Sequence, residues 1–333
     1  MKFGPVPVDE AEGAMLAHSV TLAGRRLRKG QVLTAEHVAG LRSEGINEII
    51  VARADTGDLD ENAAAGRIAA ALVPEPEAQG LRLTEPFTGR VNLISEGPGV
   101  VEIDAAAIHA LNAVHPMVTV ATVPEWQQVG PGQMVATVKI IAYAVPEDAV
   151  SRAGELACRA IRLRAPVHVS AGLVVTDIPG GPDNAKGIAA IRDRLAALGI
   201  ELADVREVPH DTAQLTQALA DLGGELALVL TGSATSDMDD VAPSAVRRAG
   251  GTIERFGMPV DPGNLLFLGE IGARPVIGLP GCARSPALNG ADWVLSRVAC
   301  GVDVSSADIA AMGVGGLLKE IPTRPQPRSG RRG

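Results

Sequence analysis

Aromatic side chains are scarce in this sequence: Phe, Trp and Tyr make up 2% of the residues. A core must therefore be built from Ala, Val, Leu and Ile. The chain also lacks the aromatic platforms on which proteins stack single-stranded nucleic acids. Its net charge of −9 at pH 7 argues against a broad surface for binding a phosphate backbone. We therefore expect no nucleic-acid partner.

Cysteines and long apolar runs are also missing. The three cysteines, Cys158, Cys282 and Cys300, are too few for a disulfide framework and have no metal-ligand spacing, so we expect reduced thiols. No apolar run approaches the roughly 20 residues that span a bilayer. The N-terminus, MKFGPVPVDEAEG, has no basic start followed by an apolar core, so we expect no signal peptide. These absences predict a soluble, cytoplasmic protein without a membrane partner.

The length of 333 residues, with 46% hydrophobic residues and a mean hydropathy of +0.18, is enough for two or three domains with cores. Residues 1–54 predict a small α/β module. It contains a hairpin-like piece, a helix that Thr34 caps and Gly45 ends, and a strand from Glu48 to Val51.

Residues 55–150 predict a β-rich α+β region. It begins with the helix DENAAAGRIAAALV and a connector, PEPEAQG. Four β-branched segments then predict strands, namely GRVNLIS, GVVEID, MVTVATV and GQMVATVKIIAYAV. The segment DAAAIHALNAV predicts a short helix among them.

From residue 165 to residue 303, predicted strands alternate with predicted helices. The strands are VHVSAGLVV, IELADVREV, ELALVLT and RPVIGLP, and each precedes a helical segment. This order predicts a three-layer α/β domain, in which helices cover both faces of a parallel sheet. Residues 304–333 predict a partly disordered tail that includes KEIPTRPQPRSGRRG; its basic charge could contact a partner or be solvated.

The loop of residues 231–240 follows an apolar strand, at the edge of a parallel sheet where ligands bind. Small and hydroxyl-bearing residues here are predicted to bind an anionic ligand: Thr231, Gly232, Ser233, Thr235 and Ser236. Three carboxylates suit Mg²⁺, so we predict Asp240 and Asp237 as catalytic and Asp240 and Asp239 as metal ligands. The alternative is that Asp237, Asp239 and Asp240 favour the dipole of the next helix at its N-terminus, which Pro243 marks.

A second loop, residues 279–286, follows the last predicted strand. We predict Ser285 as the cap of the next helix, with Pro286 in the first helical position and free N–H groups pointing out of the loop. Ligand-binding residues predicted here are Pro280, Gly281, Arg284 and Ser285. Arg284 offers a bidentate contact to phosphate, whereas Cys282 has no paired His and suits a lining role better than a nucleophilic one.

Two further segments follow the first two strands. The loop of residues 176–184 is rich in Gly, Pro and Asx residues but contains neither common phosphate-binding fingerprint. After the next strand, the pair His210 and Asp211 could serve acid–base chemistry, or Asp211 could cap a surface helix. We include Asp211 among the predicted ligand-binding residues.

At these loops the sequence resembles the molybdenum-cofactor-biosynthesis domain, which molybdopterin adenylyltransferases and molybdopterin molybdenumtransferases share. The segment TGSATSDMDDVAPSAV is similar to the TGGTGxxxRDVTPEAV of the adenylyltransferases. The segment MPVDPGNLLFLGEIGARPVIGLPGCARSPA is similar to the MKPGKP…G…KPVFGLPGNPVSA of the molybdenumtransferases. Several motifs in one order make the resemblance specific over residues 165–303.

The resemblance implies that Asp240 is a required carboxylate near the pterin phosphate and a metal, and that residues 281–285 line the pterin pocket. The chain departs from the family at five places. Ser233 replaces the second glycine of the Thr-Gly-Gly motif, and Ala234-Thr235 replaces the next Thr-Gly pair. Asn264 replaces a lysine that would bind phosphate. Cys282 and Ala283 replace an Asn-Pro pair, and His210 stands where an acidic residue is expected.

The leading hypothesis is a molybdenum-cofactor biosynthesis protein of the molybdopterin molybdenumtransferase type. It would bind molybdopterin or its adenylylated form and promote molybdate insertion with Mg²⁺. A second hypothesis is a catalytically degenerate carrier that delivers the cofactor to a molybdoenzyme. A third is a hydrolase of another nucleotide-like pyrophosphate. By analogy with relatives, the chain could form a homo-oligomer.

Overall fold

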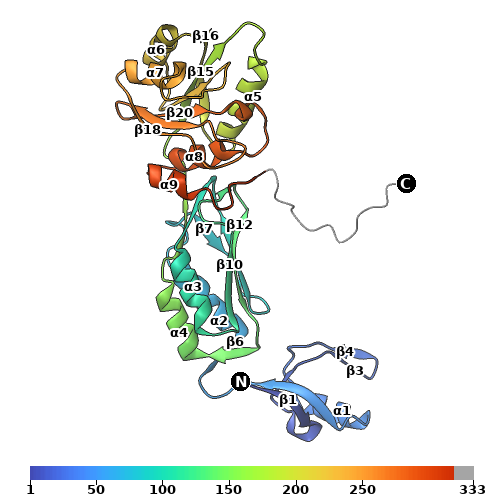
Figure 1. The fold of residues 1–333 in the computed structure, drawn as a ribbon. Helices are drawn as coiled ribbons and strands as arrows, with labels where there is room; N and C mark the ends of the chain where they lie inside the picture. The colour runs from blue at the N-terminus through green and yellow to red at the C-terminus, as the bar shows by residue number, and fades with distance from the viewer. Residues whose placement is uncertain (319–333) are drawn as a thin grey trace, which may run out of the picture. The chain divides into compact units, whose positions relative to one another are not determined.

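A computed structural model describes residues 1–318 of the protein and divides the chain into two compact units. The first unit comprises residues 1–97, 101–125 and 131–163, and the second comprises, among the described residues, 98–100, 126–130 and 164–318 (Figure 1). The predicted disorder of the C-terminal tail falls mainly on residues 319–333, outside the described residues. Among residues 1–318, no helix has the length and apolar character needed to cross a membrane.

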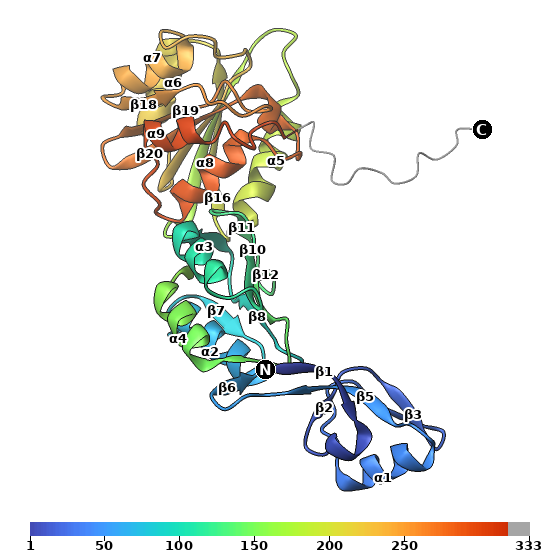
Figure 2. The same cartoon turned by 60° about the horizontal axis from the view of Figure 1, so that its bottom comes forward.

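The N-terminal part of the first unit is a small α/β arrangement (Figure 2). Its strands are β1 (Lys2–Pro7), β2 (Met15–Leu16), β3 (Val20–Leu22), β4 (Arg25–Leu27) and β5 (Glu48–Arg53). A 3₁₀ turn, Val8–Glu10, follows β1, and helix α1 (Ala35–Ser43) lies between β4 and β5 in the chain. Strands β1, β5 and β2 form one antiparallel sheet, and β3 and β4 form a hairpin. Thr34 caps α1 as predicted, because its hydroxyl accepts from the backbone N–H of His37.

The rest of the first unit is an antiparallel sheet with three helices. Its elements are β6 (Asp58–Asp60), α2 (Glu61–Leu72), β7 (Leu81–Leu83), β8 (Arg90–Ser95), α3 (Ala105–Val114), β10 (Val118–Thr122), β12 (Met134–Ile140), β13 (Ala144–Pro146) and α4 (Glu147–Leu156). The four-stranded sheet has the order β10–β12–β8–β7. The two predicted helices are found as α2 and α3, and the predicted strands GRVNLIS and MVTVATV as β8 and β10. The last predicted segment, GQMVATVKIIAYAV, is divided into two strands of different sheets, β12 and β13. Helix α4 was missed, because small residues, Ala153 and Gly154, form much of its buried face and weaken the apolar pattern.

The second unit contains a six-stranded sheet in the order β16–β15–β17–β20–β19–β18. Its strands are β15 (Ser170–Asp177), β16 (Glu201–Pro209), β17 (Leu226–Leu230), β18 (Thr252–Phe256), β19 (Phe267–Ile271) and β20 (Arg274–Leu279). Its helices are α5 (Asn184–Ala196), α6 (Thr212–Asp221), α7 (Val241–Arg248), α8 (Gly290–Ala299) and α9 (Ser306–Ala311). Apolar residues of α5, α8 and α9 cover one face and those of α6 and α7 cover the other (Figure 1). The predicted three-layer architecture is confirmed.

The sheet is parallel only across its first four strands. Strand β19 runs antiparallel to β20, and β18 runs antiparallel to β19. The alternating pattern failed to predict this edge, because no helix separates β18, β19 and β20. Gly272, at a φ of +62°, allows the tight turn between β19 and β20, where Ile271 pairs with Arg274.

The second unit is discontinuous in sequence. Strand β11 (Gln128–Val129) pairs with Gly99 and Val100 at the start of β9 (Gly99–Ile103), and residues 98–100 and 126–130 cluster with the later chain. In this unit the Arg297 guanidinium lies 5.8 Å from the centre of the Trp126 ring, which suits a cation–π interaction. Strand β14 (Ile161–Arg164) completes the order β11–β9–β14.

Candidate functional site at the carboxyl edge of the sheet

The loops that follow β15, β17 and β20 meet at one edge of the sheet, because these strands are parallel. Arg284, in the 3₁₀ turn after β20, joins the three loops. Its Nη2 donates to the carbonyl of Thr231 at 3.0 Å, and its Nη1 donates to Oδ1 of Asn184 at 3.1 Å. The two loops on which the sequence placed the ligand are therefore brought together.

The Arg284 side chain is partly buried in this contact, and burial lowers its pKa from the ordinary value. Its Nε is buried and has no hydrogen-bond partner among residues 1–318. Room for the guanidinium depends on Gly187, where a Cβ would lie 2.9 Å from Nη1. Arg284 thus holds the loops together, and its predicted contact with phosphate stays a prediction.

The hydroxyls of the 231–240 loop fall into two groups. The Thr231 hydroxyl donates to the carbonyl of Ser233 at 2.6 Å, and the Thr235 hydroxyl lies 3.4 Å from it, with both residues buried. Ser233 and Ser236 are exposed, and their hydroxyls form no hydrogen bond with any other residue that the structure describes. Within this loop, these two serines are the ones placed to donate a hydroxyl to a ligand.

The three carboxylates of this loop already have partners in the chain. Asp240 caps α7, accepting from the N–H of Val241 at 2.7 Å and from the N–H of Ser236 at 3.0 Å. Asp239 pairs with Arg247 at 2.8 Å, and Asp237 accepts from the N–H of Asp239. The helix begins at Val241, two residues before Pro243, because Asp240 supplies the cap.

These contacts do not fit the predicted Mg²⁺ site. No group of three or more His, Cys, Asp or Glu side chains in the described part of the chain is arranged to hold a metal ion. Asp240 instead matches the alternative hypothesis, because its carboxylate stabilises the N-terminus of helix α7.

The predicted helix start at Ser285 is wrong. The cap of helix α8 is Asn289, four residues later, where the Asn289 side chain accepts from the N–H of Ala291 and Asp292 accepts from the N–H of Asn289. The N–H of Gly290 donates to the carbonyl of Pro262 at 2.8 Å. The first N–H groups of this helix therefore bond within the chain and do not point out of the loop.

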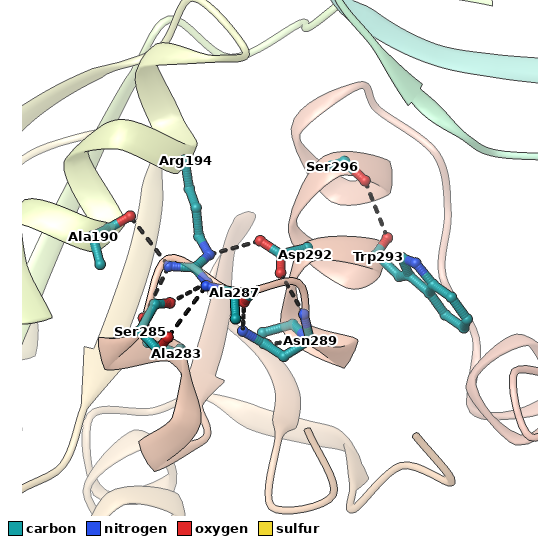
Figure 3. Close-up of polar contacts among 10 residues, drawn as sticks. Ala190, Arg194, Ala283, Ser285, Ala287, Asn289, Asp292, Trp293 and Ser296 are labelled. Atoms are coloured by element: carbon teal, nitrogen blue, oxygen red, sulfur yellow. Dashed lines mark hydrogen bonds and ion pairs between the residues drawn. The ribbon is translucent and has the colours of Figure 1, made fainter. Parts of the chain in front are cut away.

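The segment between β20 and α8 is held by Arg194, a residue of α5 that sequence reasoning missed (Figure 3). Its guanidinium donates to four backbone carbonyls, those of Ala190, Ala283, Ser285 and Ala287. Its Nε lies 2.6 Å from Oδ1 of Asp292, and the two side chains are only 9% and 15% exposed. The contacts explain why residues 285–289 stay non-helical, because Arg194 takes carbonyls that a helix would bond internally. The sequence did contain a signal for this role. Arg194 is a charged residue on the face of α5 that also carries the buried Ala190 and Ile191, and a charge on such a face needs a partner.

His210 and Asp211, which follow β16, make different contacts. Asp211 caps α6 by accepting from the N–H groups of Ala213 and Gln214, both at 3.0 Å. The capping alternative is thus realised, and ligand binding by Asp211 stays a prediction. His210 places its Nδ1 2.8 Å from Oγ1 of Thr176, at the end of β15.

The residues that depart from the family pattern also lie near this edge. The exposed Asn264 turns its amide toward the carbonyl of Met258 at 3.4 Å. Gly263 lies against the start of α8, where a Cβ would come within 2.6 Å of the N of Gly290. Cys282 is half-buried in the turn after β20.

The second unit is similar in sequence to a known family. A family model described as a probable molybdopterin binding domain covers residues 183–297. Residues 183–297 match that family. The resemblance inferred from the loops is confirmed by this match, which includes the 231–240 loop, Arg284 and Arg194. Residues 5–53 match a different family, a domain of unknown function (DUF8806).

Two solved structures match most of the chain at low sequence identity. The chain is similar to a molybdopterin biosynthesis MoeA protein from Pyrococcus horikoshii, with 13% identity and a TM-score of 0.31 over 90% of this chain and 75% of that one. It is also similar to a molybdenum cofactor biosynthesis protein from Pyrococcus furiosus, with 12% identity and a TM-score of 0.24 over 93% and 65% of the two chains. These TM-scores are too low to carry an argument. No curated protein sequence matches the chain.

Proposed function

We propose that the chain binds molybdopterin, free or adenylylated, at the carboxyl edge of the β15–β17–β20 sheet and promotes molybdate insertion. One observation carries the proposal: Arg284 joins the loops after three parallel strands into one surface, inside the part of the chain that matches a probable molybdopterin binding domain. Ligands of open α/β sheets bind at this edge.

The residues of this surface would act by binding and orienting the ligand. The exposed hydroxyls of Ser233 and Ser236 would donate to phosphate oxygens, with backbone N–H groups of the loops around them. Pro280 and Gly281 would line the pterin beside the turn that Arg284 anchors. No step is assigned to Mg²⁺, because the carboxylates of the 231–240 loop are engaged within the chain.

A second candidate is a carrier that binds the cofactor without turnover and delivers it to a molybdoenzyme. The position of Asn264 favours it. Its side chain is a neutral amide that donates to the carbonyl of Met258 at 3.4 Å, so position 264 supplies no cation for a phosphate. The carrier predicts molybdopterin binding together with no molybdenum insertion.

The full-length chain, titrated with molybdopterin and then assayed for molybdenum insertion, separates the two candidates. Binding with insertion supports the transferase, and binding without insertion supports the carrier. Absence of binding, combined with no release of a fluorescent oxidised pterin when the purified protein is denatured, refutes both. Hydrolysis of a dinucleotide by a chain that does not bind pterin would instead identify a pyrophosphate hydrolase.

Asp240 is the residue whose substitution tests the proposed reaction most directly. Asp240→Asn keeps an oxygen that can cap α7 and removes the charge, whereas Asp240→Ala removes both. If the charge serves the reaction, both variants lose insertion activity. Asp240→Ala also loses both accepted hydrogen bonds, at a cost of about 0.5–2 kcal/mol, whereas Asp240→Asn keeps one of the two and loses less stability. An Asp240→Asn variant that inserts molybdenum at the wild-type rate would reduce Asp240 to a helix cap.

A further inference from the structure

We propose that His210 is a fixed hydrogen-bond donor to an anionic oxygen of the bound ligand, and that Thr176 sets its tautomer. The proposal rests on the proposed function for the identity of the ligand. It assigns a specific atom, the Nε2–H of His210, to ligand recognition at the carboxyl edge.

The argument begins with Thr176, whose side chain is fully buried at the end of β15. Its Oγ1 accepts a hydrogen bond from the backbone N–H of Gly232 at 2.9 Å. Its own hydroxyl hydrogen then needs an acceptor, because a buried hydroxyl that donates to nothing is costly.

His210 supplies that acceptor. Its Nδ1 lies 2.8 Å from Oγ1 of Thr176, and no other acceptor of the Thr176 hydroxyl is found among residues 1–318. If Nδ1 carried a hydrogen, it would donate to Oγ1 and leave the Thr176 hydroxyl hydrogen unpaired. The chain of hydrogen bonds therefore runs from Gly232 through Thr176 to Nδ1 of His210.

The tautomer follows from this direction. A neutral imidazole that accepts at Nδ1 carries its hydrogen on Nε2. His210 is half-buried, and its Nε2 forms no hydrogen bond with any other residue of the described chain. The ring thus presents one oriented donor beside the loop that begins at Thr231.

A donor of this kind selects for ligands. It favours a phosphate oxygen at this position and disfavours an N–H group that has no acceptor, because two donors cannot pair. It also belongs to a segment distinct from Ser233 and Ser236, so the ligand would be held from the β16 side as well as the β17 side. Thr176 is a positioning residue in this arrangement, because it acts through His210.

Two substitutions separate ligand binding from a structural role. His210→Gln keeps an N–H donor near the position of Nε2 and loses the acceptor at Nδ1. His210→Asn keeps an acceptor near the position of Nδ1 and loses the donor at Nε2. We expect His210→Asn to weaken binding of molybdopterin to the full-length chain by roughly tenfold to a hundredfold, and His210→Gln to weaken it by much less. A purely structural His210 gives the reverse order and would overturn the proposal.

Thr176 provides the second test. Thr176→Val removes the hydroxyl that fixes the tautomer, whereas Thr176→Ser retains it. We expect the ¹H–¹⁵N spectrum of ring nitrogens in the ligand-free protein to show hydrogen on Nε2 of His210 in the wild type and in Thr176→Ser. In Thr176→Val we expect a mixture of tautomers. Hydrogen on Nδ1 in the wild type contradicts the proposal.

Inorganic phosphate, titrated into ¹⁵N-labelled protein, distinguishes this proposal from the proposed function. A phosphate-dependent shift of the His210 Nε2 signal, in a protein that does not bind molybdopterin, supports the donor and refutes the proposed ligand. A protein that binds molybdopterin while this signal stays fixed with both compounds refutes the donor alone. A signal that neither compound moves, in a protein that binds neither, refutes both.

Discussion

Replacing Arg194 should destabilise the second unit more than the loss of any exposed charge. Arg194→Met keeps most of the volume of the side chain and removes five hydrogen bonds, four of them to carbonyls and one to Asp292. Breaking a buried ion pair by removing one partner costs about 3–5 kcal/mol. Asp292 keeps one contact, with the N–H of Asn289, so the lower part of that range is expected. The loss should concentrate on residues 283–289, whose carbonyls Arg194 holds.

The measurement is urea unfolding followed by tryptophan fluorescence. Both tryptophans of the chain, Trp126 and Trp293, belong to the second unit, so the signal reports that unit. With a urea dependence of about 2 kcal/mol per M, a loss of ~3–4 kcal/mol lowers the midpoint by roughly 1.5–2 M. Arg192→Met is the matched control, since Arg192 is an exposed residue of the same helix, and it should change stability by no more than about 0.5 kcal/mol. Equal midpoints for Arg194→Met and Arg192→Met would refute the role given to Arg194.

Two other outcomes follow from the geometry of the second unit. Gly187→Ala should cost about 1–3 kcal/mol and disturb Arg284, because a Cβ there would lie 2.8 Å from Cδ2 of Leu230 and 2.9 Å from Nη1 of Arg284. Gly130→Ala, where a Cβ meets no atom within 4 Å, is the control in the same tryptophan-detected unfolding. Burial raises the pKa of the Cys300 thiol from 9.0 to about 11, so Cys300 should react with a thiol reagent at pH 8 only after unfolding. Because the folded pKa is the higher one, the stability that this thiol contributes is complete below pH 9.0 and falls as the pH rises toward about 11; a Cys300→Ala variant that retains the same decline would exclude Cys300 as its source.

Local patterns predicted most of the elements because their determinants are local. Thr34 and Asp60 cap helices that begin one residue later, and the apolar strand β17 is followed at once by its loop. The parallel order of β15, β16, β17 and β20 follows from alternation with helices. The antiparallel edge depends on pairing between β18, β19 and β20, which no helical pattern between them could reveal.

The sequence predicted where the candidate site lies, but it did not predict most of the hydrogen bonds that hold it. The sequence located the loops of residues 231–240 and 279–286, and the structure joins them through Arg284. Their hydrogen bonds were beyond local reasoning, because the partners are distant in the chain. Arg194 reaches the carbonyl of Ala287 across 93 residues. Ser285 is followed by Pro286, a good local signal for a helix start, yet tertiary contacts at Asn289 and Arg194 place the start elsewhere.

The discontinuity of the second unit has a consequence for how the chain is synthesised and divided. Residues 98–100 and 126–130 leave the ribosome well before Arg164, yet they cluster with the part of the chain that follows it. Trp126 cannot meet Arg297 until nearly the whole chain has been made. A fragment that begins at Arg164 would likewise keep every strand of the six-stranded sheet while losing β11 and the indole beside Arg297. The smallest continuous piece that contains every segment of the second unit therefore begins at Pro98 and carries residues 101–125 and 131–163 of the first unit with it.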